Sequence, residues 1–364
     1  MRIAQIAPPI EGVPPQTYGG TERVIHYLTE ELVALGHEVT LFASGDSVTS
    51  AELVPCVPRA LRLEPQVRDV IPYYMLLLDR VYRRADSFDI LHFHIDQFHF
   101  PLFRSMSGRT VTTLHGRQDL PDLHALYSGF PEMPLVSISM AQRKPVPTAN
   151  FVANILHGIP QDLHRLIDQP RGGYLAFLGR IAPEKRPDRA IAIARTAGIP
   201  LKIAAKVDRA DEGYFREKIV PLISDSPNVE FIGEINERQK SEFLGEASAV
   251  LFPIDWPEPF GLVMIEAMAL GTPTIAFRCG SVPEVIENGV NGAIVSSEDE
   301  AVAALPSVLS LDRRKIRRRF EQRFTATRMA KDYLDLYHSL VSQTEAGSEL
   351  RTVESPDLMT ASRP

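Results

Sequence analysis

The 364 residues are 44% hydrophobic and 23% charged, which is the composition of a soluble globular protein. This length predicts two domains of about 150–200 residues each. The net charge of −7 argues against a nucleic-acid partner. The two cysteines, Cys56 and Cys279, lie too far apart in the sequence for a disulfide framework or a zinc cluster to be expected.

The sequence contains no signal that places it in a membrane. No apolar run approaches the roughly 20 residues that a membrane-spanning helix needs. Residues 1–7 are too short for a signal-peptide core and lack a small-residue cleavage site, so they read as a first buried strand. We therefore expect a cytoplasmic protein.

Short β-branched apolar runs alternate with segments of helical periodicity along the whole chain. This alternation predicts an α/β fold, in which helices cover parallel sheets. Caps place helices at 21–36 and 187–198. In the first half, strands are expected at 2–7, 38–43, 89–93, 110–114, 135–138 and 151–155. In the second half, they are expected at 174–178, 201–205, 229–232, 249–252, 274–277 and 292–295.

The chain is expected to divide into two Rossmann-like, doubly wound domains that face each other. Residues 161–173 have no sustained period and read as a linker, which gives an N-terminal domain at 1–165 and a second domain at 172–324. Ligands of such sheets bind outside the carboxyl ends of the strands, so the cleft between the domains is the expected site. A terminal helix is expected at 325–341. The polar tail at 342–364 is expected to be disordered.

A strongly basic run occupies 313–319, where six of the seven residues are Arg or Lys. We favour a solvated helix or turn that faces acidic neighbours. The alternative is a patch that binds an anionic membrane, and it is less favoured because the run is not amphipathic. Association with a membrane surface therefore remains an alternative that the sequence does not support.

In the first half, glycines and histidines mark the ends of predicted strands. Gly19 and Gly20 lie in a strand-to-helix turn, where backbone N–H groups and the helix dipole favour a phosphate. His115 follows a buried strand and either contacts a sugar hydroxyl in the cleft or is a structural histidine. His92 and His94 share a strand face and raise a metal hypothesis, but packing or hydrogen bonding is favoured because no third ligand has fixed spacing.

In the second half, charged residues follow the predicted strands. Arg180 and Lys185 lie between the first strand and its helix, where two cations can clamp a diphosphate and neutralise it as a leaving group. Glu258 lies in a loop before an apolar helix that contains Glu266. A carboxylate in so apolar a segment needs hydrogen bonds, either from ribose hydroxyls or from a donor within the protein.

These motifs together resemble glycosyltransferase family 4, the retaining enzymes that use sugar nucleotides. The resemblance rests on EPFGLVMIEAMALGTP at 258–273, GRIAPEK at 179–185, YGG at 18–20 and TLHG at 113–116, and by motif order it covers about residues 1–340. It implies the GT-B architecture, in which two Rossmann-like domains enclose a cleft. It also implies that the terminal helix crosses back to the first domain.

The resemblance assigns roles at the phosphate end of a donor site. It implies that Arg180 and Lys185 hold the donor diphosphate, and that Gly20, beside Gly19, approaches it through its backbone. Lys206 stands where many relatives have a glycine, so we expect it to add a phosphate contact.

At the other end, the resemblance implies that Glu266 binds the ribose and that Ile235 borders the base. Glu258 would contact hydroxyls of the donor sugar, and His115 would contact that sugar from the opposite domain. The backbone N–H groups near the sugar would be those of Phe260, Gly261 and Leu262.

The expected activity is retaining transfer of a sugar from a nucleotide-sugar donor, preferably a UDP-sugar such as UDP-glucose, to a hydroxyl acceptor. The acceptor would be a saccharide, a lipid-linked molecule or a small molecule. We expect no cofactor and no metal, since the chain contains no D-x-D triplet. Two alternatives remain, a sugar-nucleotide 2-epimerase and a non-catalytic nucleotide-sugar-binding protein. The residues expected to act in catalysis are Glu258, His115, Arg180 and Lys185.

Overall fold

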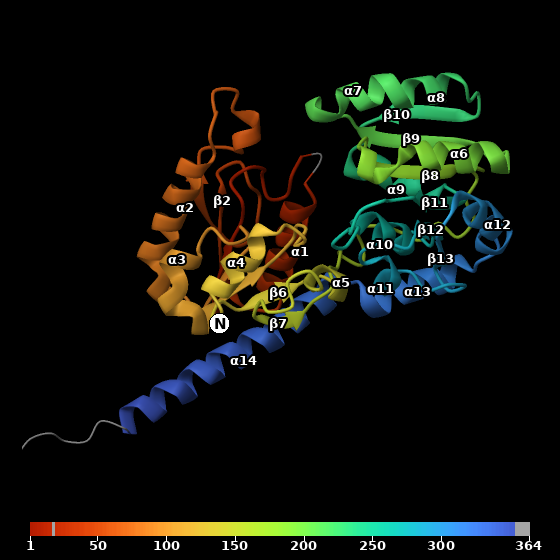
Figure 1. Ribbon diagram of the computed structural model, residues 1–364. Coiled ribbons are helices and arrows are strands. Elements are labelled where there is room, and N and C mark those ends of the chain that lie inside the picture. The colour runs from red at the N-terminus through yellow and green to blue at the C-terminus, as the bar shows by residue number, and fades with distance from the viewer. Residues whose placement is uncertain (17–18, 354–364) are drawn as a thin grey trace, which may run out of the picture.

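The computed structural model describes residues 1–16 and 19–353, and they form two parallel α/β units side by side (Figure 1). The first unit holds a seven-stranded sheet with strand order β3-β2-β1-β4-β5-β6-β7. The second holds a six-stranded sheet with the order β10-β9-β8-β11-β12-β13. Each order changes direction beside its first strand, β1 or β8, which creates the switch point where ligands of such sheets bind.

Every strand expected from the sequence is present. The strands of the first sheet are β1 (Arg2–Ile6), β2 (Glu38–Ser44), β3 (Glu52–Val57), β4 (Ile90–Phe93), β5 (Thr110–Thr113), β6 (Leu135–Ser137) and β7 (Phe151–Asn154). Those of the second are β8 (Leu175–Arg180), β9 (Leu201–Lys206), β10 (Val229–Gly233), β11 (Ala249–Phe252), β12 (Thr274–Phe277) and β13 (Gly292–Val295). Sequence reasoning missed β3, which contains Pro55 and pairs only with β2 at the sheet edge, where proline is tolerated.

Helices follow most strands and cover both sheets. In the first unit they are α1 (Gly20–Ala34), α2 (Ile71–Arg84), α3 (Phe100–Phe103), α4 (Asp122–Gly129) and α5 (Met140–Arg143). The later ones are α6 (Pro187–Ala197), α7 (Glu212–Tyr214), α8 (Val220–Ser224), α9 (Glu237–Gly245), α10 (Leu262–Ala269), α11 (Val282–Val285), α12 (Glu298–Leu309), α13 (Arg313–Arg323) and α14 (Ala326–Val353). Short turns of 3-10 helix are η1 (Leu61–Leu63), η2 (Ala85–Ser87), η3 (Arg104–Arg109), η4 (Pro183–Lys185) and η5 (Arg209–Asp211), and η6 (Phe215–Ile219) is a π-helical turn.

The chain crosses between the units twice, and the two crossings lie against each other. Ile159 pairs with Thr325 in an isolated β-bridge. A Cβ atom on Gly158 would come within 2.2 Å of the Thr325 carbonyl oxygen, so only glycine fits here. After this point α14 runs back along the first unit (Figure 1) and buries Tyr333 and Tyr337 against it.

Helix α14 is longer than the sequence predicts. It continues to Val353, so the expected helix end at 341 and the expected disorder from 342 are wrong as far as residue 353. The last part of the predicted tail, 354–364, lies outside the described residues. No described helix is both long enough and apolar enough to span a bilayer.

The basic run lies in α13. Its predicted pairing with acidic neighbours is confirmed, but the prediction that the whole run is solvated is wrong. Arg314 pairs with Asp168 and Arg319 pairs with Glu287, as expected for a surface helix facing acidic neighbours. Arg313, however, is buried, and burial lowers the pKa of its guanidinium to about 10. Arginines of α13 donate to carbonyl groups at or just after the ends of α9 and α10, which lack partners within their own helices, and to carbonyl groups of the segment between the units. Arg313 donates to the carbonyl groups of Ile167, Gly245, Ala247 and Gly271, and Arg317 donates to those of Gln161, His164 and Ala269.

One hydrophobic core is shared by the two units. It joins Leu28 and Leu32 of α1 to Met264 of α10, Phe320 of α13 and Tyr333 of α14, all of which are fully or almost fully buried. The two units are therefore packed against each other through this shared core, and the space between the carboxyl ends of their strands lies next to it.

Candidate active site

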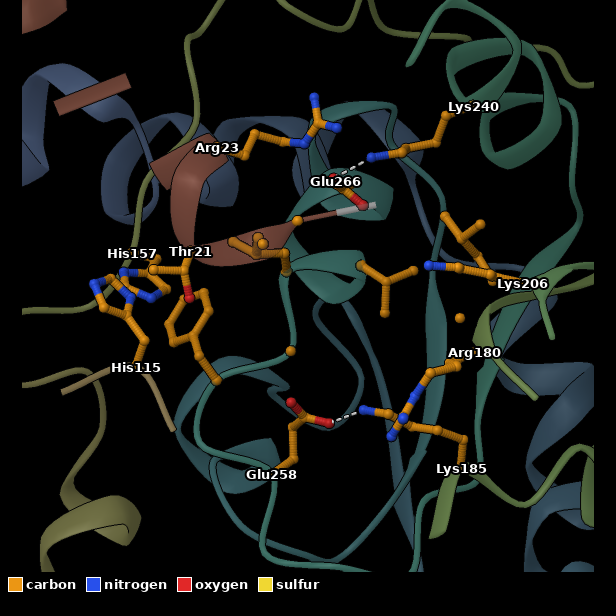
Figure 2. A pocket seen from close by; sticks show the side chains of 18 of the residues that line it. Thr21, Arg23, His115, His157, Arg180, Lys185, Lys206, Lys240, Glu258 and Glu266 are labelled. Carbon is orange, nitrogen blue, oxygen red and sulfur yellow. Dashed lines mark hydrogen bonds and ion pairs between the residues drawn. The ribbon is translucent and has the colours of Figure 1, made fainter. Parts of the chain in front are cut away.

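A cavity of about 420 Å³ lies between the two units at the carboxyl ends of their strands. Every residue that the sequence analysis places in the donor site lines it. The first unit contributes Gly19, Gly20 and His115. The second contributes Arg180, Lys185, Lys206, Ile235, Glu258 and Glu266, together with Phe260, Gly261 and Leu262 at the start of α10. Figure 2 shows the charged side chains arranged around the hollow.

Lys185 and Glu258 form an ion pair at one end of the cavity (Figure 2). The indole Nε1 of Trp256 also donates to Oε2 of Glu258, at 3.0 Å. The Lys185 ammonium lies 4.8 Å from the centre of the Trp256 ring, within the range of a cation–π contact. Trp256 therefore holds both partners of the pair in place.

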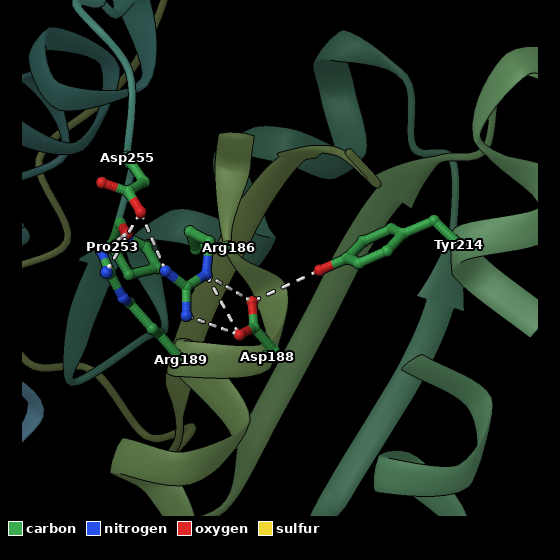
Figure 3. A network of polar contacts seen from close by, with 6 residues as sticks. All are labelled: Arg186, Asp188, Arg189, Tyr214, Pro253 and Asp255. Atoms are coloured by element: carbon green, nitrogen blue, oxygen red, sulfur yellow. Dashed lines mark hydrogen bonds and ion pairs between the residues drawn. The ribbon is translucent and has the colours of Figure 1, made fainter. Parts of the chain in front are cut away.

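A polar network fixes the turn that carries Lys185 (Figure 3). The neighbouring Arg186 has the left-handed φ of 54°, which is costly for a residue with a side chain. Its guanidinium donates to Asp188 at 2.8 Å and to Asp255 at 3.0 Å. Asp255 belongs to the loop that leads to Glu258, and it also accepts from Arg189. These bonds tie the Lys185 turn to the Glu258 loop.

The Glu258 loop is supported from behind by residues 280 and 281. A Cβ atom on Gly280 would come within 2.3 Å of the Glu258 carbonyl oxygen. The Ser281 backbone N–H donates to that same oxygen at 3.0 Å, and the Ser281 hydroxyl donates to the Phe260 carbonyl at 2.7 Å. These contacts leave the first N–H groups of α10 at the cavity wall, where they attract an anion.

Two further cations, Arg180 and Lys206, are surrounded by carboxylates. Arg180 donates to Glu184 at 2.7 Å and lies 3.6 Å from Asp208 and Asp211. Lys206 lies 3.1 Å from Asp208. The Arg180 Nε is buried without a hydrogen-bond partner among the described residues. An anionic ligand in the cavity would therefore compete with these carboxylates for Arg180 and Lys206.

Glu266 is 4% exposed and accepts a hydrogen bond from Lys240 at 2.7 Å. Burial by itself raises the pKa of this carboxyl, but the Lys240 ammonium, with His164 and Arg23 nearby, brings the pKa below its usual value. Of the two alternatives that the sequence left open, the internal donor is present. The carboxyl also lines the cavity, so a ligand can still reach it.

Two polar contacts join the two units. Arg23 of α1 pairs with Glu237 of α9 at 2.7 Å. Glu284 of α11 accepts from the backbone N–H groups of Met140 and Ala141, at 2.7 and 2.8 Å, and so caps α5 of the opposite unit. We call these two contacts the interdomain clasps. They hold the units with the cavity between them.

His115 lies in a short segment that α5 holds in place. The Gln142 amide donates to the carbonyl groups of Leu114 and Gly116, each at 2.8 Å. Burial lowers the pKa of His115 to about 3, so the imidazole is neutral at physiological pH. Its ring stacks beside that of His157, with centroids 5.3 Å apart.

His92 and His94, for which the sequence favoured packing or hydrogen bonding over a metal, are hydrogen-bonded to other side chains. His92 contacts Tyr337 and Thr113, and His94 contacts His115 and Gln5. A different group, His164, Glu237 and Glu266, has ligand atoms within 4.8 Å of one another. The Lys240 ammonium already contacts both of those glutamates, at 3.1 and 2.7 Å, so the group is an ion-pair network.

Sequence reasoning missed several residues of the cavity wall. Arg23, His157 and Lys240 line it, and so does Glu22, which is 7% exposed. Burial raises the pKa of Glu22 to about 6. The YGG motif shortly before Glu22 and Arg23 was the available signal.

Two facing doubly wound units, a charged cleft between their strand ends and a last helix that returns to the first unit define a protein of the GT-B class. A family model described as "Glycosyltransferase Family 4" matches residues 18–152, and one described as "Glycosyl transferases group 1" matches residues 169–326. Together these matches cover most of the chain. The chain belongs to glycosyltransferase family 4.

Individual relatives are distant or match in part. The D-inositol 3-phosphate glycosyltransferase of Mycolicibacterium smegmatis is 30% identical over 158 residues, which cover 42% of this chain and 34% of that protein. The match thus spans about a third of that relative's length. The N-acetyl-alpha-D-glucosaminyl L-malate synthase of Bacillus anthracis is 23% identical over 376 residues, covering 90% of this chain and 96% of that protein.

Solved structures share the fold over nearly the whole chain. AviGT4, a glycosyltransferase involved in avilamycin A biosynthesis, superposes with a TM-score of 0.71 at 24% identity, covering 94% of this chain and 98% of that one. Anabaena Alr3699/HepE, solved with UDP and glucose, superposes with a TM-score of 0.70 at 18% identity, covering 93% of this chain and all of that one.

Proposed function

We propose that the protein is a retaining glycosyltransferase that moves a sugar from a nucleotide-sugar donor to a hydroxyl acceptor. The observation that carries this proposal is the division of charge in the cavity. Arg180, Lys185 and Lys206 gather at one end, and the buried carboxyl of Glu266 lies at the other. A diphosphate suits the first end and a ribose, with its two hydroxyl donors, suits the second.

The N-termini of α1 and α10 meet at the middle of this cavity, where Gly20 approaches Leu262. A Cβ atom on Gly20 would lie 3.5 Å from Cδ1 of Leu262. Backbone N–H groups of both helices can thus bind the phosphates from opposite sides. Since Gly20 belongs to the first unit, the donor would be enclosed only when the interdomain clasps hold the two units together.

In the proposed reaction the bond between the anomeric carbon and the diphosphate breaks. The acceptor oxygen bonds to the same face of that carbon, and the acceptor proton passes to the departing diphosphate. Arg180, Lys185 and the helix N-termini stabilise the charge that develops on the diphosphate, a role that preorganised groups fill efficiently. Glu258 and His115 contact the sugar. These cations supply the positive charge that a metal would otherwise provide, so we propose that no metal or other cofactor is needed.

A UDP-sugar, such as UDP-glucose, is the preferred donor. Support comes from Anabaena HepE, a protein of the same fold that was solved with UDP-glucose. The relatives named above act with acceptors as different as D-inositol 3-phosphate and L-malate, so the acceptor class stays open. Sugar-nucleotide 2-epimerisation and binding without catalysis are the competing functions.

The test is to incubate the purified chain with UDP-glucose and a mixture of hydroxyl acceptors, with and without EDTA. NMR of the products would identify the anomer. We expect an α-linked glucoside and released UDP in both conditions. An inverted anomer would refute retention, a new epimer formed from UDP-N-acetylglucosamine alone would favour the epimerase, and tight binding without turnover would favour a binding protein.

Substitution at the phosphate end tests the proposed roles. We expect Lys185→Ala to lower turnover by about 100-fold or more, because it removes a cation that stabilises the leaving diphosphate. The matched control is Lys202→Ala, since Lys202 of β9 is partly exposed and pairs with Glu230 outside the cavity. Equal activity in the two variants would refute the diphosphate assignment.

A further inference from the structure

A chain of buried hydrogen bonds connects the cavity wall to the C-terminal helix. Nε2 of His115 lies 2.9 Å from Nδ1 of His94, and Nε2 of His94 lies 2.8 Å from Oε1 of Gln5. Nε2 of Gln5 in turn lies 3.2 Å from the hydroxyl of Tyr337 on α14. Gln5 and Tyr337 are completely buried and His94 is 3% exposed. We call these four residues the His115 relay.

The chemistry of the glutamine amide gives the His115 relay a direction. Oε1 of Gln5 can only accept, so Nε2 of His94 must carry a proton. Burial lowers the pKa of His94 well below its usual value, so its ring is neutral and its Nδ1 is an acceptor. Nε2 of His115 must therefore be the donor to that atom. In the neutral ring of His115, the remaining nitrogen, Nδ1, then carries a lone pair and no proton.

The Tyr337 end of the His115 relay independently supports this assignment of donors and acceptors. The Tyr337 hydroxyl lies 2.6 Å from Nδ1 of His92. This distance is typical of a hydroxyl donor and shorter than most bonds donated by N–H groups. Tyr337 thus donates to His92, and its oxygen is left to accept from Nε2 of Gln5. The opposite orientation of the Gln5 amide would reverse these bonds and place a proton on Nδ1 of His115.

The free nitrogen of His115 is available to a ligand. His115 lines the cavity, and its Nδ1 has no hydrogen-bond partner among the described residues. A neutral nitrogen with a lone pair accepts a hydrogen bond from a hydroxyl group. It repels a carboxylate, which has no proton to donate at neutral pH.

We propose that Gln5 and His94 are positioning residues that hold His115 in the Nε2–H tautomer, so that its Nδ1 recognises a hydroxyl group of the donor sugar and discriminates against a sugar carboxylate. The statement about the donor rests on the proposed function. The statement about the tautomer does not, since it follows from the hydrogen bonds and the burial of the protein's own residues. The two parts can therefore be tested separately.

The tautomer is tested by NMR of the full chain labelled with ¹⁵N in its histidine rings, with His115→Gln used to assign the signal. We expect Nε2 of His115 to be protonated and Nδ1 to be bare in the wild type. In His94→Phe the signal should change to a mixture of both tautomers. The matched control is His99→Phe, because His99 is equally buried but bonds to Thr112 outside the relay.

A proton on Nδ1 of His115 in the wild type would overturn the proposal. So would a His115 signal that stays the same in His94→Phe. If that variant does not fold, Gln5→Met removes the Oε1 atom that holds the proton on Nε2 of His94, with little change of volume. The wild-type spectrum remains decisive by itself. In the folded variant we expect kcat/KM for the donor to fall by about 5- to 10-fold, the usual effect of one hydrogen bond. The inhibition constant of free UDP should stay unchanged, because UDP carries no sugar.

The recognition of a hydroxyl is tested by calorimetry with UDP-glucose and UDP-glucuronate. We expect UDP-glucose to bind at least about tenfold more tightly, because the carboxylate of the other sugar meets a lone pair. Equal affinities would overturn the discrimination. If neither compound binds, the proposed donor is wrong, and the spectrum of His115 still decides the tautomer.

Discussion

Replacing Lys240 with methionine removes the ammonium that neutralises the buried Glu266 and keeps most of the side-chain volume. Nζ of Lys240 lies 2.7 Å from Glu266 and 3.1 Å from Glu237, and its side chain is only 13% exposed. Removal of one partner from a buried pair costs about 3–5 kcal/mol. Because Arg23 and His164 still face Glu266 in the variant, we expect the lower end, about 3 kcal/mol at about pH 8.

The loss should depend on pH, and its sign follows from the pKa of Glu266. In the wild type that pKa is lowered, so the carboxylate contributes stability above the unfolded pKa, and the contribution disappears as pH falls through the folded pKa. Without Lys240, burial dominates and raises the pKa, so the variant protonates Glu266 earlier. The difference between the two proteins should therefore be largest at about pH 8 and shrink towards about pH 4.

Urea denaturation, followed by circular dichroism at several pH values, measures this difference. The double variant Lys240→Met/Glu266→Gln is the control, because removal of the charge on Glu266 should restore most of the lost stability. A Lys240→Met protein within about 0.5 kcal/mol of the wild type at about pH 8 would show that the pair contributes little. A deficit independent of pH would show that lost packing, and not an unpaired carboxylate, causes it.

Three further substitutions test other features. Glu22→Gln should stabilise the protein by about 2 kcal/mol above pH 7 in urea denaturation, because burial raises the pKa of Glu22 to about 6. The gain in stability should vanish below the unfolded pKa of the carboxyl, and a gain that is the same at every pH would contradict this cause. Arg313→Met should destabilise by about 3 kcal/mol, because it leaves buried carbonyl groups without donors; Arg318→Met, at an exposed position, is the thermal-denaturation control. Glu284→Ala should remove the two hydrogen bonds of one interdomain clasp, raise KM for the donor several-fold and increase the radius of gyration in X-ray scattering. An unchanged radius would show that this clasp does not hold the units together.

The fold was predictable because its signals are local. The strands at β1, β4 and β5 are continuous buried runs, and Gly36 and Gly198, both with a left-handed φ, mark the ends of α1 and α6. The missed elements lack such local signals. Strand β3 contains Pro55 and forms only through β2 at the sheet edge, and α14 extends beyond its apolar periodicity.

The site residues that belong to motifs at strand ends could be predicted from the sequence. The motifs predicted which residues face the cavity, but not how those residues pair before a ligand binds. Lys240 contacts Glu266 only because α9 packs beside α10, and Arg23 meets Glu237 only because the two units close. The role of Arg313 was hidden for a similar reason, since the carbonyl groups that it binds come from three separate segments.

The return of α14 to the first unit has a consequence for the order in which the protein is made. Tyr337 follows Gln5 by 332 residues, yet the two side chains contact each other beneath His115. On the ribosome, the first sheet emerges long before the helix that completes its polar interior. A nascent chain therefore exposes an incomplete histidine network until α14 has emerged, and the proposed site is complete only after Tyr337 has left the ribosome.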